Sequence, residues 1–266
     1  MPSVAILGAG HLGGALTYAL ASRARFEEVR LIDTAGTVAV GKALDIRQAG
    51  PPDGYSTRVT GHMDIGAAAG AWVVVLADPL PATGSSATPD DVISLLRTVT
   101  SAAPGAMLVC ADASHAPLLR RLVGAGICAP DLLVGSAPGA AVSAARTLVA
   151  LATNSAPAEV AVCLRSASET TPPPIDWHRV SVRGCPADEL LTAEQRDRVD
   201  RQLAAAWPPG PYALAAAAAR VTEAAWFGCR RTQTTWVADR SVDVDGNGVA
   251  DVVFDPGGRM RSVGAR

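Results

Sequence analysis

The sequence lacks the features of proteins that bind nucleic acids, span membranes or depend on disulfides. Its 266 residues carry a formal net charge of -2, so there is no excess of cations to displace counterions from a nucleic acid. No apolar run is long enough for a membrane span, and no basic, apolar leader precedes the first expected strand. The five cysteines are odd in number and form no Cys-x-x-Cys pair. We therefore expect a cytoplasmic protein with reduced thiols, no metal site, no nucleic-acid partner and no membrane contact.

What the sequence does contain is a high apolar content. Hydrophobic residues make up 49% of the chain and charged residues 18%, which is typical of a globular protein with one large or two modest cores. Nearly all of the cations are arginine, since Lys42 is the only lysine. Long disordered stretches are not expected from this composition.

The first half of the chain alternates short apolar strands with helical stretches, as in a doubly wound parallel sheet. We expect its strands at residues 4–7, 29–32, 58–60, 72–77, 107–111 and 132–135. From about Gly139 the pattern changes to a helix at 143–152, strands near 159–165 and 178–184, helices within 192–206 and 212–227, and a final hairpin. The sequence therefore predicts an α/β protein, with a Rossmann-type domain (residues 1–138) followed by a smaller mixed α/β domain (residues 139–266).

The segment after the fourth expected strand contains a loop and then a helix start. Residues 78–87 are rich in proline, glycine, threonine and serine, which indicates a loop. Thr88 is a favoured N-cap residue, and Pro89 suits the first position of a helix. The carboxylates of Asp90 and Asp91 would then face the positive end of that helix.

The most specific motif is the turn Gly8-Ala9-Gly10-His11-Leu12-Gly13 between the first strand and a helix. Such glycines let the backbone approach a pyrophosphate at the helix N-terminus. Asp33 follows the second strand, where a carboxylate can accept from both ribose hydroxyls of an adenosine and would repel a 2′-phosphate. The motif predicts NAD in preference to NADP, and a purely structural strand-helix-strand unit is the alternative.

Three further motifs point to a known family. They are Gly41-Lys42-Ala43-Leu44-Asp45, then Val59-Thr60-Gly61 with Asp64, and Gly246-Asn247-Gly248-Val249. With the glycine turn, they make the chain resemble the lactate/malate dehydrogenase family from residue 4 to about 255. The resemblance implies homodimers or homotetramers and hydride transfer between NAD and a 2-hydroxy acid. It places Gly8, Gly10, His11, Leu12 and Gly13 around the pyrophosphate, Asp33 on the adenine ribose, and Ala77 and Asp78 beneath the middle of the cofactor.

The resemblance also implies catalytic residues, and here the chain departs from the family. Arg146 matches the arginine that grips the substrate carboxylate, although Ser143 replaces the aspartate of that Asp-x-x-Arg segment. We expect Arg146 to bind a small carboxylic acid, and bracing of the domain seam is the alternative. The family's His-Gly-Asp segment corresponds to residues 168–170, but no histidine lies between His115 and His178.

The other polar groups of the family's reaction are also missing. No arginine or lysine lies between His62 and Leu96, where the mobile-loop arginine should be, and Asp112 replaces an asparagine. A positioned acid or base contributes about 10²–10⁴ in rate, so we expect weak or absent ordinary activity. Two functional classes are then open, a dehydrogenase acting through substitutes such as Asp112, His115 or Glu169, and a non-catalytic dinucleotide-binding sensor or subunit. A third possibility is that cofactor binding is lost too. The alternative for His115 is a solvated or helix-capping role. The alternative for Glu169 is a position on the rim of the site.

The segment Asp243–Asp251 has the acidic spacing of a calcium loop, but Phe254 replaces the bidentate glutamate at position 12. Asn247-Gly248 is also a preferred hairpin turn, and we favour a hairpin here. We expect His62 and His178 to be structural.

Overall fold

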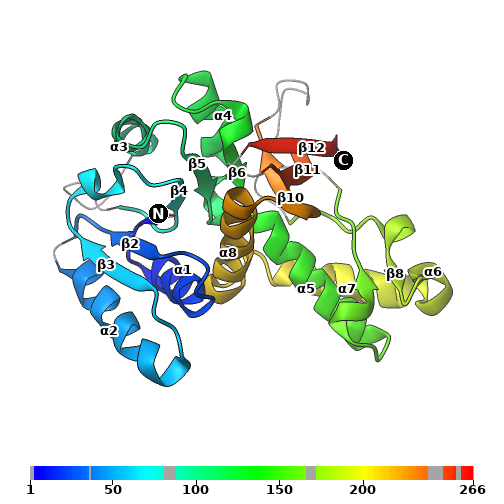
Figure 1. Ribbon diagram of the computed structural model, residues 1–266. Helices are drawn as coiled ribbons and strands as arrows, with labels where there is room; N and C mark the ends of the chain where they lie inside the picture. Colours follow the sequence, from blue (N-terminus) through cyan, green and yellow to red (C-terminus); the bar gives the residue numbers. More distant parts are fainter. Residues whose placement is uncertain are drawn as a thin grey trace.

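The computed structural model describes residues 3–35, 37–80, 88–165, 172–238, 248–255 and 259–265, and its main element is a nine-stranded sheet (Figure 1). The strands lie in the order β12-β11-β10-β6-β5-β4-β1-β2-β3. The parallel part consists of β1 (Ser3–Leu7), β2 (Glu28–Ile32), β3 (Arg58–His62), β4 (Val73–Leu76), β5 (Met107–Cys110) and β6 (Leu133–Gly135). Every strand expected in the first half of the sequence is present, so this part of the predicted fold is confirmed.

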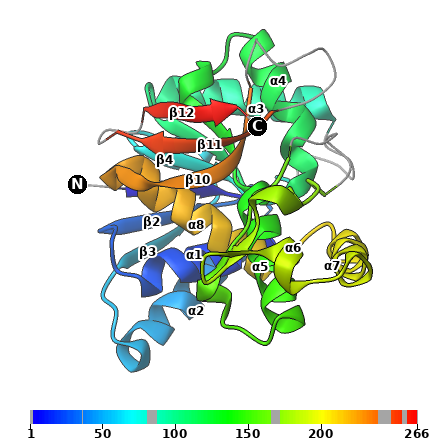
Figure 2. The same cartoon turned by 90° about the vertical axis from the view of Figure 1, so that its right-hand side faces the viewer.

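Helices cover both faces of this sheet. On one face lie α1 (His11–Ser22), α2 (Val38–Asp53) and α8 (Pro211–Phe227), and on the other α3 (Pro89–Ala102) and α4 (Ala116–Gly124) (Figure 1 and Figure 2). All four residues of β4 are therefore buried, which explains why its sequence is an unbroken apolar run. None of the helices that the structure describes has the length and apolar character needed to cross a bilayer.

The predicted start of α3 at Thr88 is confirmed. The Thr88 hydroxyl accepts from the backbone N–H of Asp91 at 3.3 Å, and the Asp91 carboxylate accepts from the N–H of Thr88 at 2.8 Å. Helix α5 (Ala137–Ala152) begins earlier than the predicted residue 143. Pro138 lies in its first turn, where a proline needs no N–H partner, so the helix can start before the apolar pattern becomes regular.

A second, smaller core surrounds α5. It contains α6 (Ala187–Leu190), α7 (Ala193–Ala205) and a small sheet of β7 (Val160–Ala161), β8 (Ser181–Val182) and β9 (Cys185–Pro186). Figure 2 shows α6 and α7 beside α5, away from the large sheet.

The two strands predicted in this region, at 159–165 and 178–184, were predicted too long. The first continues past β7 only as an isolated bridge between Leu164 and Ile175. The second is shortened at both ends. Trp177–Arg179 forms a 3-10 helix (η5), and Arg183 and Gly184 turn the chain with φ values of 52° and 84°.

The C-terminal strands return to the large sheet. β10 (Cys229–Val237), β11 (Gly248–Phe254) and β12 (Met260–Ala265) continue it antiparallel from β6. β10 and β11 pair antiparallel, with Gly248 opposite Val237, as a final hairpin requires. The turn predicted at Asn247-Gly248 lies partly outside the described residues, and β12 was not predicted. Trp236 on β10 packs over Gly135 on β6, where an added Cβ would lie 2.9 Å from the indole ring. α8 and these strands thus share one core with β1 to β6. Separately, α5 begins at Ala137, next to residue 138, where the domain boundary was predicted.

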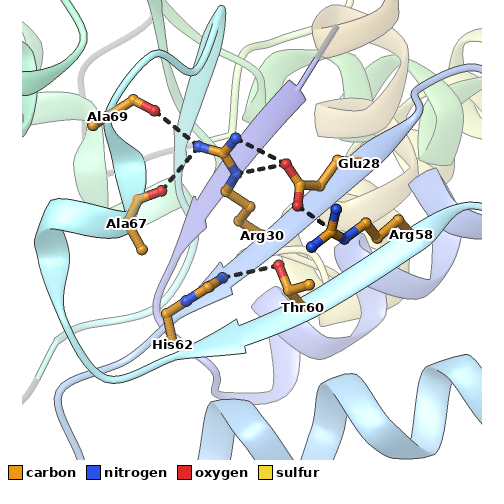
Figure 3. A network of polar contacts seen from close by, with 7 residues as sticks. All are labelled: Glu28, Arg30, Arg58, Thr60, His62, Ala67 and Ala69. Atoms are coloured by element: carbon orange, nitrogen blue, oxygen red, sulfur yellow. Dashed lines mark hydrogen bonds and ion pairs between the residues drawn. The ribbon is translucent and has the colours of Figure 1, made fainter. Parts of the chain in front are cut away.

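Polar contacts tie together the outer strands of the parallel sheet. Figure 3 shows this network, formed by Glu28, Arg30, Arg58, Thr60, His62, Ala67 and Ala69. Arg30 donates to Glu28 at 2.8 Å and to the carbonyl oxygen of Ala69 at 2.8 Å. The ring of His62 hydrogen-bonds the Thr60 hydroxyl at 2.9 Å, and both residues lie on β3, the edge strand of the sheet.

Candidate functional site

The turn between β1 and α1 has the geometry that its glycine pattern predicts. Gly8 has φ +93°, which residues with a side chain rarely adopt, and Gly10 is the N-cap of α1. A Cβ on Gly13 would lie 1.9 Å from the carbonyl oxygen of Gly8, so the helix passes directly over the turn. His11 is exposed and Leu12 is buried. These residues lie together at the positive end of α1.

Asp33 lies beside this turn, at the end of β2. Its side chain is 5% exposed, and its Oδ2 accepts from the backbone N–H of Ala9 at 2.6 Å. Its Oδ1 accepts from the N–H of Ala35 at 2.8 Å. Each carboxylate oxygen has a second lone pair, so the side chain can still accept from a ribose hydroxyl.

Ala77 and Asp78 follow β4 and also meet the turn. Ala77 is buried, and its N–H donates to the carbonyl oxygen of Leu7 at 2.9 Å. The Asp78 carboxylate lies on the start of α1, where Oδ1 accepts from the N–H of Leu12 at 3.2 Å and Oδ2 from the N–H of Gly13 at 2.6 Å. Below, these two N–H groups are called the α1 amide site.

NAD, the cofactor predicted from the sequence, fits the residues around the turn only in part. The carboxylate beside the turn suits an adenosine ribose. The α1 amide site, which a pyrophosphate would need, is already bonded to the chain's own carboxylate, whose negative charge would repel a phosphate. The pyrophosphate therefore does not fit while Asp78 keeps this position.

Lys42 is a residue of the site that sequence reasoning missed. It extends from α2 toward the turn, and its Nζ donates to the carbonyl oxygen of Gly10 at 2.5 Å. The signal was present in the sequence, because Lys42 is the only lysine and lies in one of the family-like motifs. It brings a positive charge to within hydrogen-bonding distance of the turn.

Asp112 and His115 follow β5 and cap the short helix η2 (Ala113–His115). Asp112 Oδ1 accepts from the backbone N–H of Ser114 at 2.8 Å and from its hydroxyl at 2.6 Å. His115 Nδ1 accepts from the N–H of Asp112 at 3.3 Å. Both side chains thus take part in local hydrogen bonds at the end of β5.

The environment of His115 makes it a weak base. Burial lowers its pKa to about 4, although the neighbouring Asp112 carboxylate opposes that shift. The ring also lines a cavity of about 300 Å³ with apolar neighbours that include Leu76, Leu80 and Val92. A general base at neutral pH works best with a pKa near 7. At that pH His115 is neutral, and it binds a proton much less readily than such a base.

Arg146 lies on α5, one turn after the exposed Ser143. Its Nε is buried and has no hydrogen-bond partner within the described ranges. Burial lowers its pKa, and the positive charge of Arg220 lowers it further. A guanidinium in this setting suits an anion, and its planar fork can hold both oxygens of a carboxylate.

Some predicted residues cannot be placed. Glu169 lies outside the described residues, as do residues 243–247 of the segment with calcium-loop spacing. Residues Gly248–Phe254 of that region form strand β11. Among the residues that are described, no three His, Cys, Asp or Glu side chains form a group that could hold a metal ion. His178 is an exposed residue of η5.

A larger cavity, of about 540 Å³, lies away from the turn. It opens between the C-terminal ends of α1 and α8 and the start of β10, and four arginines line it: Arg23, Arg25, Arg220 and Arg231. Arg23 is paired with Glu223 at 3.4 Å, and Arg25 lies over the ring of Phe227. None of the residues predicted for the functional site lines this cavity.

Comparison with known sequences gives matches to part of the chain. No family model matches it. A stretch of 78 residues is 38% identical to the malate dehydrogenase of Neorickettsia sennetsu, and it covers 29% of this chain and 25% of that protein. A stretch of 80 residues is 36% identical to the malate dehydrogenase of Roseiflexus sp. (strain RS-1), covering 30% of this chain and 26% of that protein. The matched region thus spans about a quarter of the length of these relatives.

Comparison with solved structures covers almost the whole chain. The lactate dehydrogenase of Cryptosporidium parvum in complex with lactic acid and NAD matches with a TM-score of 0.81 and 21% identity, over 100% of this chain and 91% of that one. The malate dehydrogenase of Salinibacter ruber matches with a TM-score of 0.82 and 20% identity, over 98% and 88%. At such identities the likeness establishes the fold. The fold and the matched stretch of sequence are both similar to those of lactate and malate dehydrogenases.

Proposed function

We propose that this chain is an NAD-recognising relative of the 2-hydroxy acid dehydrogenases in which ordinary hydride transfer is weak or absent. The observation that supports this most directly is the state of His115, the histidine that could replace the missing base. Burial lowers its pKa to about 4, and its Nδ1 already accepts from Asp112. The chain would then act as a dinucleotide-binding sensor or as a subunit of a larger assembly.

The absence of other groups needed for the reaction supports the same proposal. The sequence has no arginine or lysine between His62 and Leu96 to polarise a carbonyl group. Loss of a positioned base costs about 10²–10⁴ in rate, or roughly 3–5 kcal/mol of barrier. Loss of a charge-stabilising donor typically costs about 10²–10³ more, although such losses do not simply add. Turnover should therefore be far below that of a working dehydrogenase.

We assign ligand recognition to Asp33 and Arg146. Asp33 would accept from the adenine ribose and repel a 2′-phosphate, so we propose NAD in preference to NADP. Arg146 would hold a small carboxylic acid, because its buried Nε has no partner among the described residues. NAD would have to displace Asp78 from the α1 amide site in order to bind its pyrophosphate there.

The test is a steady-state assay of NADH oxidation with pyruvate, oxaloacetate and related 2-oxo acids. We expect turnover below about 1 s⁻¹, the low end of typical enzymes, and a higher turnover would contradict the proposal. Thermal unfolding with and without NAD serves as the control, because a ligand that binds the native state must stabilise it. If turnover were found, loss of it in His115→Gln or Asp112→Asn would identify the substitute group.

We further propose that the chain forms a homodimer or homotetramer. Helix α2 exposes three large apolar side chains, with Val38 46%, Val40 44% and Leu44 52% accessible. Association with a second copy would remove this surface from water. Light scattering at micromolar concentration should give a mass of at least two chains, and a monomer would contradict the proposal.

A further inference from the structure

The side chain of Asp78 lies where a bound anion would be expected. The first N–H groups of a helix have no partner within the helix, and the helix dipole favours negative charge there. In this chain both amides of the α1 amide site already donate to one carboxylate, at 3.2 Å to Oδ1 and 2.6 Å to Oδ2. The contact joins residues 65 and 66 positions apart in the sequence, so the tertiary fold creates it.

The glycines of the turn are fitted to Asp78. A Cβ on Gly10 would lie 2.4 Å from both Cγ and Oδ1 of Asp78, and a Cβ on Gly8 would lie 2.4 Å from the Asp78 carbonyl oxygen. Side chains at either position would therefore collide with the residue that follows β4. The glycine pattern leaves the space that the Asp78 backbone and side chain fill.

We propose that Asp78 is an internal competitor of the pyrophosphate, so that a dinucleotide binds only when this carboxylate leaves the α1 amide site. The inference rests on the proposed function, since it assumes that NAD lies across the glycine turn. A pyrophosphate would need the same N–H groups, and two anions cannot share them. Asp78 thus sets the affinity for phosphate-containing ligands and leaves the adenosine contact at Asp33 unchanged.

The backbone of Asp78 is fixed more firmly than its side chain. The N–H groups of Ala77 and Asp78 both donate to the carbonyl oxygen of Leu7, at 2.9 Å and 3.3 Å, which anchors this segment to β1. The carboxylate is held by the two helix amides and lies in a half-buried position. Its release therefore requires a rotation of the side chain, with no strand leaving the sheet.

The experiment measures ligand binding by isothermal titration calorimetry for the wild-type chain and three variants. Asp78→Gly removes the carboxylate and its Cβ, whereas Asp78→Asn keeps the shape and removes the charge. Asp200→Asn is the matched control, because Asp200 is also half-buried and accepts a hydrogen bond, from Trp177 Nε1 at 2.9 Å, in the second core. The probes are NAD, ADP and adenosine, and melting curves without ligand establish that each variant is folded.

We expect NAD and ADP to bind about 10- to 100-fold more tightly to both Asp78 variants than to the wild type and Asp200→Asn. Adenosine should bind all four proteins alike, because it has no phosphate. Equal NAD affinity in the wild type and the Asp78 variants would overturn the role of Asp78 and leave the proposed function standing. If no variant bound NAD, ADP or adenosine, the proposed dinucleotide site itself would be wrong. If Asp78→Gly did not fold, Asp78→Asn would decide between these results.

Discussion

Two regions of the molecule, the glycine turn and the segments β5 and α5, differ in the polar groups that they contain. Beside β1, β2 and β4 lie the glycine turn, Asp33 and the start of α1, to which we assign dinucleotide recognition. Helix α5 carries Arg146, but the sequence has no counterpart of the base, its aspartate or the loop cation of the lactate/malate dehydrogenases that it resembles. We propose that loss has affected the residues of the reaction more than those of the turn.

The difference follows from what holds each region in place. The turn is part of the packing of the fold, since Gly13 lies against Gly8 and Asp78 fills the space beside Gly10. Such glycines are needed for stability whether or not a ligand binds. The reaction groups are side chains at a surface, and their replacement costs little stability. A glycine pattern can therefore persist for packing reasons after other parts of a ligand-binding site have been lost.

The largest effect should come from the turn itself. Gly13→Ala would place a Cβ 1.9 Å from the Gly8 carbonyl oxygen, which the backbone cannot easily avoid. We expect the free energy of unfolding to fall by about 3 kcal/mol or more. Gly41→Ala is the control, because its Cβ would meet nothing within 4 Å in helix α2 and should raise that free energy by about 0.5–1 kcal/mol. Urea unfolding measures both, and a loss below about 1 kcal/mol for Gly13→Ala would refute the packing explanation.

The next largest effect is on the pH dependence of stability, and it is expected at His115. The pKa of His115 is lowered from 6.5 to about 4 in the folded chain. Between these values the unfolded chain binds a proton that the folded chain does not, so acid favours unfolding. Stability should therefore fall as the pH drops from 6.5 to 4, by up to about 3 kcal/mol from this residue.

Urea unfolding at several pH values tests this for the wild type and His115→Gln. The variant should lose the part of the pH dependence that His115 causes. Identical slopes for the two proteins, or an NMR titration of His115 near its ordinary pKa, would contradict the account. A normal pKa would also return His115 to the possible bases of a dehydrogenase reaction.

The smallest effect on stability is expected at Arg146. Replacing it with methionine removes a half-buried charge whose Nε has no partner in the described part of the chain, so stability should change by less than about 1 kcal/mol. Oxamate, which calorimetry should show binding to the wild type, should no longer bind to Arg146→Met. Arg198→Met, at an exposed arginine of α7 paired with Glu194, is the control and should leave that binding unchanged. A large loss of stability in Arg146→Met would instead indicate that Arg146 braces the structure.

Much of the fold could be predicted from the sequence because its signals are local. The apolar runs gave β1 to β6 to within two residues at each end, and Thr88 with Asp91 marked the start of α3. The small sheet of the second core was harder, because β7 and β8 have only two residues each. Pairing of such short segments depends on contacts with α5 and η5, which no local pattern reveals.

The candidate site could likewise be predicted where its signals are local in the sequence, and not where they depend on tertiary contacts. The turn and Asp33 follow from residues that are near each other in the sequence. The position of the Asp78 carboxylate depends on the pairing of β4 with β1, so sequence reasoning could place it near the turn but not on particular amides. The state of His115 depends on burial by α3 and α4, which spacing alone does not show.

One consequence of the turn is practical. Lys42 carries the only side-chain primary amine of the protein, and that amine lies 2.5 Å from the Gly10 carbonyl oxygen. Amine-directed acylation of a side chain would therefore attach its label beside the glycines and nowhere else. The rate of that labelling would report on access to the turn, without any engineered probe.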